Sequence, residues 1–369
     1  MIIFRYLVKE VYGTLLASTI ILLLLLISNQ FVHYLTQAAS GVIPIRTVMQ
    51  IMSIQVPLLL GILLPLGLYV GILMAYGRLY VDREMTVLSA CGLSKAELLG
   101  MTLAFSLVIC ALVTALTLWA QPKVESYKRQ ILIDAASASP LEKVFQGQFT
   151  KISSANLQFY VEKLSSDHKR LENIFAAQPI IPKKPSLPTG WNITVAADGH
   201  QMIDPKTGDK FIVLNNGARY TGTPGQADFQ VTQYKTYGVR IQPNAVPLDT
   251  RVETLPTPTL WRQRHQSPQM AAELQWRLSL PLSVLILALI APPLSKVDPR
   301  QGRYAQLLPA ILLYILYLNL LFIGKAWIKS GKIPVSIGLW WIHALMLVIA
   351  VILLVRFIGL RRIVSLLKL

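Results

Sequence analysis

The sequence predicts a membrane α-helical protein with six transmembrane helices, three on each side of an inserted all-β domain that lies outside the cytoplasm. Three observations support this prediction. Hydrophobic residues make up 53% of the chain and charged residues only 14%, whereas soluble domains contain about 25% charged residues. Long apolar runs occur in two groups of three. The segment 121–270 between them is rich in charges, prolines and turn residues, which is typical of a water-exposed domain.

Each apolar run is long enough to cross a bilayer core of about 30 Å at about 1.5 Å per residue. Residues 1–10 before the first run are amphipathic and predict an interfacial helix. A signal peptide is the alternative there, but the run is long and lacks a clean cleavage site. Pro57 and Pro65 predict kinks in the second run. The runs are 11–27, 48–75, 98–119, 274–292, 304–323 and 335–357.

The basic residues in the short loops predict the orientation. Twelve lie on the side that carries both termini and four on the opposite side. The positive-inside rule therefore places both termini in the cytoplasm and 121–270 in the periplasm of an inner-membrane protein. The expected domains are 1–120, 121–270 and 271–369. The four opposite residues are Arg46, Lys325, Lys329 and Lys332.

The inserted segment has β-strand patterns. Residues 211–214 and 218–220 flank Asn215-Asn216-Gly217, which predicts a hairpin. Residues 159–161 and 229–234 predict two further strands, and the proline-rich 180–190 predicts an exposed loop. Short strands at close spacing suggest a sandwich or a jelly roll. Residues 254–268 are polar and contain prolines, and are expected to return the chain to the membrane.

Several chemistries have no support in the sequence. There is no P-loop, no H-E-x-x-H motif and no G-x-S-x-G elbow, and the five histidines are far apart in sequence. We therefore expect no catalytic residues and no metal site. Cys91 and Cys110 lie at different expected membrane levels, so no disulfide is predicted. The net charge of +17 is scattered, with no basic run longer than two, which argues against nucleic-acid binding.

The expected spans contain no deep carboxylate of the kind that ion-coupled carriers use. Any energy for transport should therefore come from another subunit.

The loop between the second and third runs predicts a short amphipathic helix at about 82–92. Asp82 is the expected N-cap, Glu84 lies in the first turn, and Met85, Leu88 and Cys91 form an apolar stripe. This helix could rest on lipid as a connector, or it could be a coupling helix that docks in a groove of an ATPase subunit. The spacing alone leaves both alternatives open.

The end of this helix is also marked. Gly92 is well placed to terminate it, and Ser94 with Glu97 forms a capping box for the next helix.

Six segments from the first residue to the last loop resemble the LptF/LptG family of lipopolysaccharide export permeases. They are 1–7, 84–95, 146–149, 214–220, 272–277 and 293–303. The stretches ACGLSK and PRQGR are the most specific and favour the LptF branch. The resemblance implies a heterodimer with an LptG-like permease, an LptB-like ATPase dimer that binds ATP and Mg²⁺, and an LptC-like single-span protein. It also implies lipopolysaccharide as substrate, a periplasmic bridge protein, and no cofactor in this chain. The fold that it implies is membrane α-helical, with six transmembrane helices (3+3) and an inserted periplasmic all-β jelly-roll domain.

The resemblance also implies functional residues. The coupling set, in which Glu84 is the key acidic contact, is Asp82, Arg83, Glu84, Met85, Leu88, Cys91 and Gly92.

For lipid phosphates, family members have basic residues near the outer end of the first span, where this chain has Gln30 and His33. Phosphate contact is therefore expected to shift to Arg46 or Lys325, with Lys329 and Lys332 as further candidates. Simple snorkelling to lipid headgroups is the alternative for these cations.

In the jelly roll, seven apolar residues either line an acyl-chain slot or form an ordinary core. They are Phe149, Phe159, Val161, Phe211, Val213, Tyr220 and Phe229. Near the fourth span, Glu273 and Arg277 lie four residues apart and, with Trp276, suggest an anchor at the membrane interface.

Two functions from different classes remain. The first is the permease subunit of an ATP-driven transporter that extracts lipopolysaccharide and passes it through the jelly roll. The second is a membrane scaffold or assembly factor whose periplasmic domain only binds partners. An intramembrane hydrolase has no nucleophile constellation behind it.

Overall fold

The computed structural model describes residues 2–39, 43–137, 146–152, 157–165, 170–180, 190–203, 210–227, 229–241, 252–296 and 307–359. The chain divides into two compact units. The membrane unit comprises Met1–Ser28, Ile54–Tyr127 and Thr250–Leu369, and the β unit comprises Asn29–Ser53 and Lys128–Asp249. The PRQGR stretch and most of the expected loop at 180–190 lie outside the described residues.

The described residues contain six helices that are long and apolar enough to cross a membrane, which confirms that prediction. The third span is built from three consecutive helical segments, and the short helices α3 (Glu84–Ala90) and α6 (Thr257–Gln263) lie outside the spans. The spans are α1 (Ile2–Ala39), α2 (Ile45–Val81), α4 (Lys95–Ala115) with its continuation, α7 (Pro268–Leu294), α8 (Leu307–Lys329) and α9 (Trp340–Ile358).

The third span does not stop near Trp119, where its apolar run ends. It continues through the π-helical turn η1 (Leu116–Ala120) into α5 (Gln121–Ser137). Pro122 is the second residue of α5 and has no amide hydrogen for the helical ladder. The π-turn widens the helix at this point, so the chain remains helical beyond the proline.

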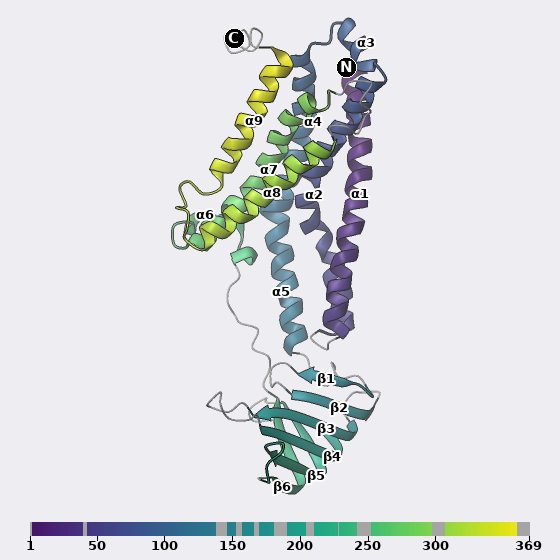
Figure 1. The fold of residues 1–369 in the computed structure, drawn as a ribbon, viewed down its shortest axis with the longest axis vertical. Helices are drawn as coiled ribbons and strands as arrows, with labels where there is room; N and C mark the ends of the chain where they lie inside the picture. Colours follow the sequence, from purple (N-terminus) through teal and green to yellow (C-terminus); the bar gives the residue numbers. More distant parts are fainter. Residues whose placement is uncertain are drawn as a thin grey trace. The chain divides into compact units, whose positions relative to one another are not determined.

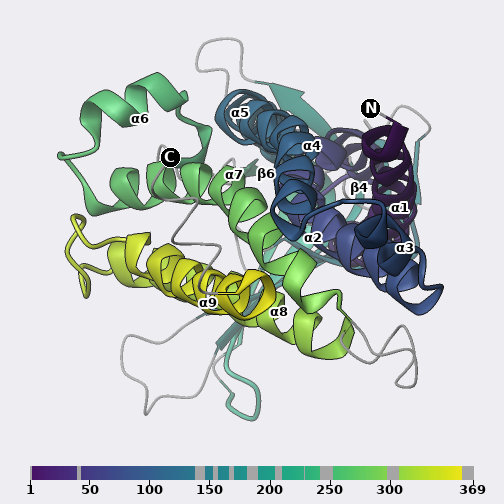
Figure 2. The ribbon, with the colours of Figure 1, turned by 90° about the horizontal axis from the view of Figure 1, so that it is seen from above.

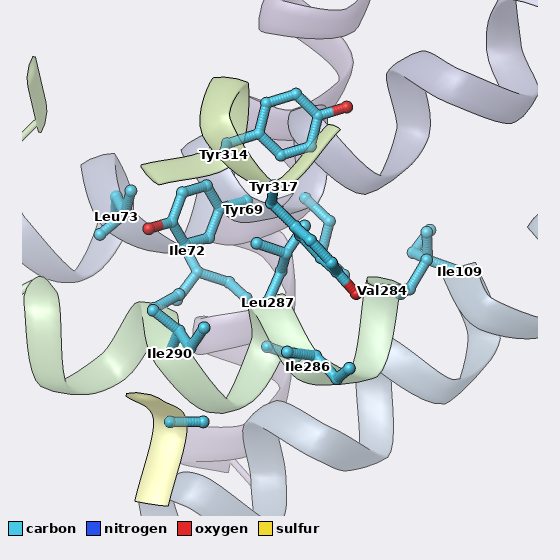
Figure 3. Packing of buried hydrophobic residues seen from close by; sticks show 14 of the residues in the cluster. Tyr69, Ile72, Leu73, Ile109, Val284, Ile286, Leu287, Ile290, Tyr314 and Tyr317 are labelled. Carbon is cyan, nitrogen blue, oxygen red and sulfur yellow. The ribbon is translucent and has the colours of Figure 1, made fainter. Parts of the chain in front are cut away.

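Helix α7 is the centre of the membrane unit. It packs against α4, α8 and α9, and Figure 2 shows it lying between α4 and α9. Figure 3 shows Tyr69, Val284 and Tyr317 gathered around Leu287 of α7, all of them buried. The hydroxyl of Tyr314 on α8 donates to the Ile62 carbonyl at 3.2 Å, which ties α8 to α2. Most of α7 is buried because helices cover it on several sides.

Glycine permits a close approach of α1 to α2. A Cβ atom on Gly71 would lie 3.0 Å from the Val11 carbonyl oxygen and 3.2 Å from the Leu15 amide nitrogen. Both neighbours are backbone atoms, which cannot rotate away as a side chain can. Small residues at such positions let membrane helices pack closely.

We expect Gly71→Ala to lower the free energy of unfolding by about 1–3 kcal/mol, because α1 and α2 must separate to accept the methyl group. Thermal unfolding of the detergent-solubilised protein measures this. Gly13→Ala is the matched control, since Gly13 lies on α1 and its added Cβ would meet nothing within 4 Å. Equal melting temperatures for the two variants would contradict the close-packing argument.

The β unit contains one antiparallel sheet in the order β1-β2-β3-β4-β5-β6, which confirms the inserted β domain (Figure 1). Consecutive strands pair with each other throughout. The strands are β1 (Phe149–Ile152), β2 (Leu157–Leu164), β3 (Arg170–Ile180), β4 (Gly190–Ile203), β5 (Lys210–Gly222) and β6 (Gln230–Ile241).

The hairpin predicted at Asn215-Asn216-Gly217 is wrong, because β5 runs unbroken through these residues. Asn216 has a left-handed backbone (φ 51°) inside the strand and lacks partners in the register on either side. A Cβ atom on Gly217 would collide with the Val195 carbonyl oxygen and the Tyr234 hydroxyl. The asparagine and glycine therefore allow a local irregularity covered by Tyr234, rather than a turn.

Candidate functional site

The short helix α3 forms where the sequence predicts a coupling helix, but it begins differently. It starts at Glu84, and the residue before it is Arg83 in a left-handed conformation (φ 61°), so the expected N-cap role of Asp82 is wrong. Gly92 has φ 99° just after the helix, as expected of a terminating glycine. The capping box of Ser94 and Glu97 at the start of α4 is confirmed.

The predicted apolar stripe of α3 does not face outward as a whole. Met85 is 2% exposed and belongs to the chain's own core, so Met85 is unavailable to a partner. Leu88 is half-buried, whereas Cys91 and Gly92 are exposed. Val87, which the stripe omits, has 60% of its surface exposed. The outward face of α3 is therefore formed around Val87, and Met85 fixes the opposite side of the helix in the core of the membrane unit.

The Glu84 carboxylate is held by Tyr6 of α1, which Arg78 of α2 contacts in turn. The Tyr6 hydroxyl donates to Glu84 Oε2 at 2.6 Å. Arg78 donates to the Tyr6 oxygen at 3.3 Å and pairs with Glu10 at 3.0 Å. Nearby, Lys95 donates to the Phe357 carbonyl at 2.6 Å, so the end of α9 lies beside the start of α4. The starts of α1 and α4, helix α3 and the end of α9 thus share one end of the membrane unit (Figure 1).

A second polar cluster lies at the start of α7. Arg277 and Glu273 are both 0% exposed, so the sequence-based prediction of an interface anchor is corrected to a buried ion network. Arg277 Nε donates to Glu273 Oε1 at 3.0 Å, and Lys325 Nζ of α8 donates to Glu273 Oε2 at 2.7 Å. A buried carboxylate with two cationic partners is compensated for its loss of water.

Arg277 also fixes the segment that leads into α7. Its guanidinium donates to the carbonyl oxygens of Glu253 and Leu255, at 2.9 and 3.0 Å, and to the Thr257 hydroxyl at 3.0 Å. Thr257 in turn donates to the Leu118 carbonyl at 2.6 Å. One arginine therefore joins the short 3₁₀ helix η4 (Val252–Thr254), α6 and α7. We call Arg277, Glu273, Lys325, Glu253 and Lys329 the α7 ion network.

Lys329 completes this network by pairing with Glu253 at 2.8 Å. Burial alone would raise the pKa of the Glu253 carboxyl, but the Lys329 hydrogen bond and charge outweigh it and hold that pKa below its usual value. Gln275 acts similarly on the α8–α9 connection, since its amide donates to the Val335 carbonyl and its oxygen accepts from the Leu339 amide. The start of α7 thus organises two connecting segments, the one that leads into α7 and the one between α8 and α9.

The four residues predicted to contact lipid phosphates fall into both units. Gln30, His33 and Arg46 belong to the β unit and Lys325 to the membrane unit. Arg46 and His33 are exposed, and His33 contacts Gln37 at 2.9 Å. Lys325 is paired with Glu273, so part of its charge is already compensated within the chain.

The seven predicted acyl-slot residues do not share one surface. Phe159 and Val161 of β2 are 2% and 0% exposed and lie in the buried cluster of the β unit. Phe149 pairs with Tyr160, so its side chain lies on the opposite face of the sheet from Phe159, and it is 67% exposed. Tyr220 and Phe229 are exposed, whereas Phe211 and Val213 are half-buried.

The face that carries Phe159 has a cavity of about 80 Å³ with an apolar floor and a polar rim. At the rim, Arg219 donates to the Tyr237 hydroxyl at 2.9 Å. The sequence did not predict most of its lining, because the lining comes from five strands, β2 to β6, whose side chains meet only in the folded sheet. The lining residues that it missed include Leu157, Ala176, Ile212, Leu214, Arg219, Tyr237 and Val239.

Six apolar spans, an inserted antiparallel sheet and an exposed short helix beside the span ends together define a polytopic membrane protein of the permease class. The comparisons specify the family. The chain belongs to the lipopolysaccharide export system permease LptF/LptG family, whose model matches residues 5–356.

Two LptF proteins illustrate this relationship. The chain is 34% identical over 358 residues to the lipopolysaccharide export system permease protein LptF of Escherichia coli strain K12. The match covers 96% of this chain and 94% of that protein. The LptF protein of Shigella flexneri matches with the same identity and coverage. The chain is therefore a multi-pass inner-membrane permease of the lipopolysaccharide export system.

Proposed function

We propose that this chain is the non-catalytic half of an ATP-driven pump that extracts lipopolysaccharide from the inner membrane. It pairs with an LptG-like permease, and an LptB-like ATPase dimer, which binds ATP and Mg²⁺, docks on the cytoplasmic end. An LptC-like protein and a periplasmic bridge protein receive the lipid. Both termini face the cytoplasm and the β unit faces the periplasm, in agreement with the positive-inside rule.

The observation that carries this proposal is the placement of α3. It lies at the end of the membrane unit shared by the start of α1 and the end of α9, with Glu84 in its first turn and Val87 exposed. A short helix that joins two spans, with an apolar exposed residue beside an acidic one, suits a groove with a cationic rim. ATP-driven closure of the partner would push α3, and the attached helices would transmit the movement to the lipid.

For the phosphates of lipid A, Arg46 is the stronger candidate in this chain. It is exposed, and arginine binds phosphate with a planar fork of donors. Gln30 and His33 supply further polar contacts on the same β unit. Lys325 can bind a lipid phosphate only while it also pairs with Glu273.

For the acyl chains, we propose passage along the sheet face that carries Phe159, Val161 and the cavity beside Arg219. This face combines a continuous apolar cluster with a cation at the rim, which suits an anionic amphiphile. A cavity of about 80 Å³ has room for a few water molecules and not for an acyl chain, so the sheet must open for passage.

A photo-crosslinking amino acid at Phe159 is expected to capture lipopolysaccharide during ATP-driven transport, whereas one at Phe149 is not. The two residues lie on opposite faces of neighbouring strands. Immunoblotting for lipid adducts in cells or in proteoliposomes measures this. Stronger capture at Phe149 than at Phe159 would place the path on the other face.

Co-purification distinguishes the pump from the alternative, a membrane scaffold with a periplasmic binding domain. Native mass spectrometry of the tagged complex is expected to find a second permease, two ATPase subunits and bound glycolipid. A stable complex that contains no ATPase would favour the scaffold.

A further inference from the structure

Tyr6 lies at the centre of a chain of polar contacts that joins three helices. Its hydroxyl donates to Glu84 of α3 at 2.6 Å and accepts from Arg78 of α2 at 3.3 Å. Arg78 is fixed in turn by its ion pair with Glu10, one turn further along α1. Because the arginine donates to the tyrosine oxygen, the single hydroxyl proton is directed at the Glu84 carboxylate. Hydrogen bonds to an ionised acceptor are short and strong, and the distance fits this kind of bond.

The Glu84 side chain needs such a contact to keep one orientation. Helix α3 has only seven residues, and the left-handed Arg83 before it offers no side-chain cap. A helix of this length is not stable on its own. Met85 fixes the buried side of α3, but a free glutamate beside it would sample several rotamers and lose entropy on meeting a partner.

Helix α1, which carries Tyr6, is held firmly at the other end of the Tyr6–Glu84 hydrogen bond. Leu7 and Val11 of α1 are 0% exposed and pack into the main core of the membrane unit. The backbone of Val11 also lies against Gly71 of α2. Tyr6 therefore extends from a fixed part of α1, and any displacement of Glu84 acts directly on that helix.

We propose that Tyr6 is the positioning residue of the coupling helix. Its hydroxyl holds the Glu84 carboxylate ready for a cation of the ATPase subunit and connects that contact to α1. This inference rests on the proposed function, in which Glu84 meets the ATPase. It adds a specific route for the movement of α3. That movement reaches α1 through the Tyr6–Glu84 hydrogen bond, and it also reaches α2 through the backbone that joins α2 to α3.

The test uses the whole complex of this chain with its permease and ATPase partners, reconstituted with lipopolysaccharide. Tyr6→Phe removes only the hydroxyl, and the measured quantity is lipid extracted per ATP hydrolysed. We expect this ratio to fall about fivefold, the change that corresponds to one hydrogen bond of about 1 kcal/mol. Tyr12→Phe is the matched control, because Tyr12 is on the same helix and donates to the Phe105 carbonyl at 2.8 Å without contacting Glu84.

A double-mutant cycle separates positioning from simple stability. If Tyr6 acts through Glu84, then Tyr6→Phe added to Glu84→Gln should reduce the ratio no further than Glu84→Gln alone. If a variant assembles too poorly for this assay, the amount of ATPase retained by the tagged chain replaces the ratio in the same cycle.

The outcomes separate the two proposals. Full coupling in Glu84→Gln would overturn the proposed coupling role itself. Loss of coupling in Glu84→Gln with equal behaviour of Tyr6→Phe and Tyr12→Phe would overturn only the positioning role. Independent, multiplying effects of Tyr6→Phe and Glu84→Gln would also overturn it.

Discussion

Arg277→Leu is expected to lower the free energy of unfolding of this protein by about 3–5 kcal/mol, the largest stability change that the structure predicts. Arg277 is fully buried and donates to Glu273, Thr257 and two backbone carbonyls. Leucine fills much of the space but removes the guanidinium from all of these acceptors, of which Glu273 keeps its bond to Lys325. An unsatisfied buried acceptor costs about 1–3 kcal/mol. Chemical unfolding in detergent, followed by tryptophan fluorescence, measures the change.

Arg264→Leu is the control for this prediction. Arg264 directly follows α6, is half-buried, and donates to the carbonyl of Trp261 three residues earlier in a hydrogen bond that is exposed to solvent. Its replacement should change stability by no more than about 0.5 kcal/mol. A stability loss for Arg277→Leu as small as that of Arg264→Leu would mean that the α7 ion network contributes little.

Glu84→Lys is expected to abolish at least about nine-tenths of lipopolysaccharide export, the largest functional effect. The lysine cannot accept the Tyr6 hydrogen bond and lies near Arg78. It would also present a positive charge to the cation that we propose on the ATPase. Bringing like charges together at an interface costs several kcal/mol, which is more than a tenfold loss of affinity. Export to the cell surface and ATPase retention on the tagged chain provide the measurements.

Asp82→Lys tests whether position matters or only charge. Asp82 is exposed and lies two residues before Glu84, so its reversal changes the net charge equally. We expect a much milder defect from it. Normal export in Glu84→Lys, or equal defects in the two variants, would be incompatible with a specific contact at Glu84.

Local features of α3 and its neighbours follow from the sequence where short-range bonds decide them. The Ser94–Glu97 capping box and the terminating Gly92 depend on residues within three or four positions, and both are present. The start of α3 was predicted incorrectly. Aspartate commonly caps helices, but α2 continues to Val81 and α3 begins only at Glu84, so Asp82 lies in the turn between the two helices. The hairpin at 215–217 failed for a related reason. Turn-forming residues can also occupy an irregular strand when neighbouring strands cover them.

The spacing of Glu273 and Arg277 was visible in the sequence, but the meaning of the pair was not. Four residues apart on a helix, they can pair at a surface or in a core. Lys325, which completes the pair, is 52 residues away from Glu273. Only the packing of α7 against α4, α8 and α9 reveals that the pair is buried.

The amino-acid sequence alone determined the membrane class, the six spans, the inserted β domain and the position of the short helix between the second and third spans. These features arise from composition, from the length of apolar runs and from bonds between near neighbours. The tertiary structure decided which side chains of α3 are available, how the sheet faces divide the predicted acyl-slot residues, and that an ion network is buried at the start of α7. Those features depend on contacts between residues far apart in the chain, which leave no periodic signal in a single sequence.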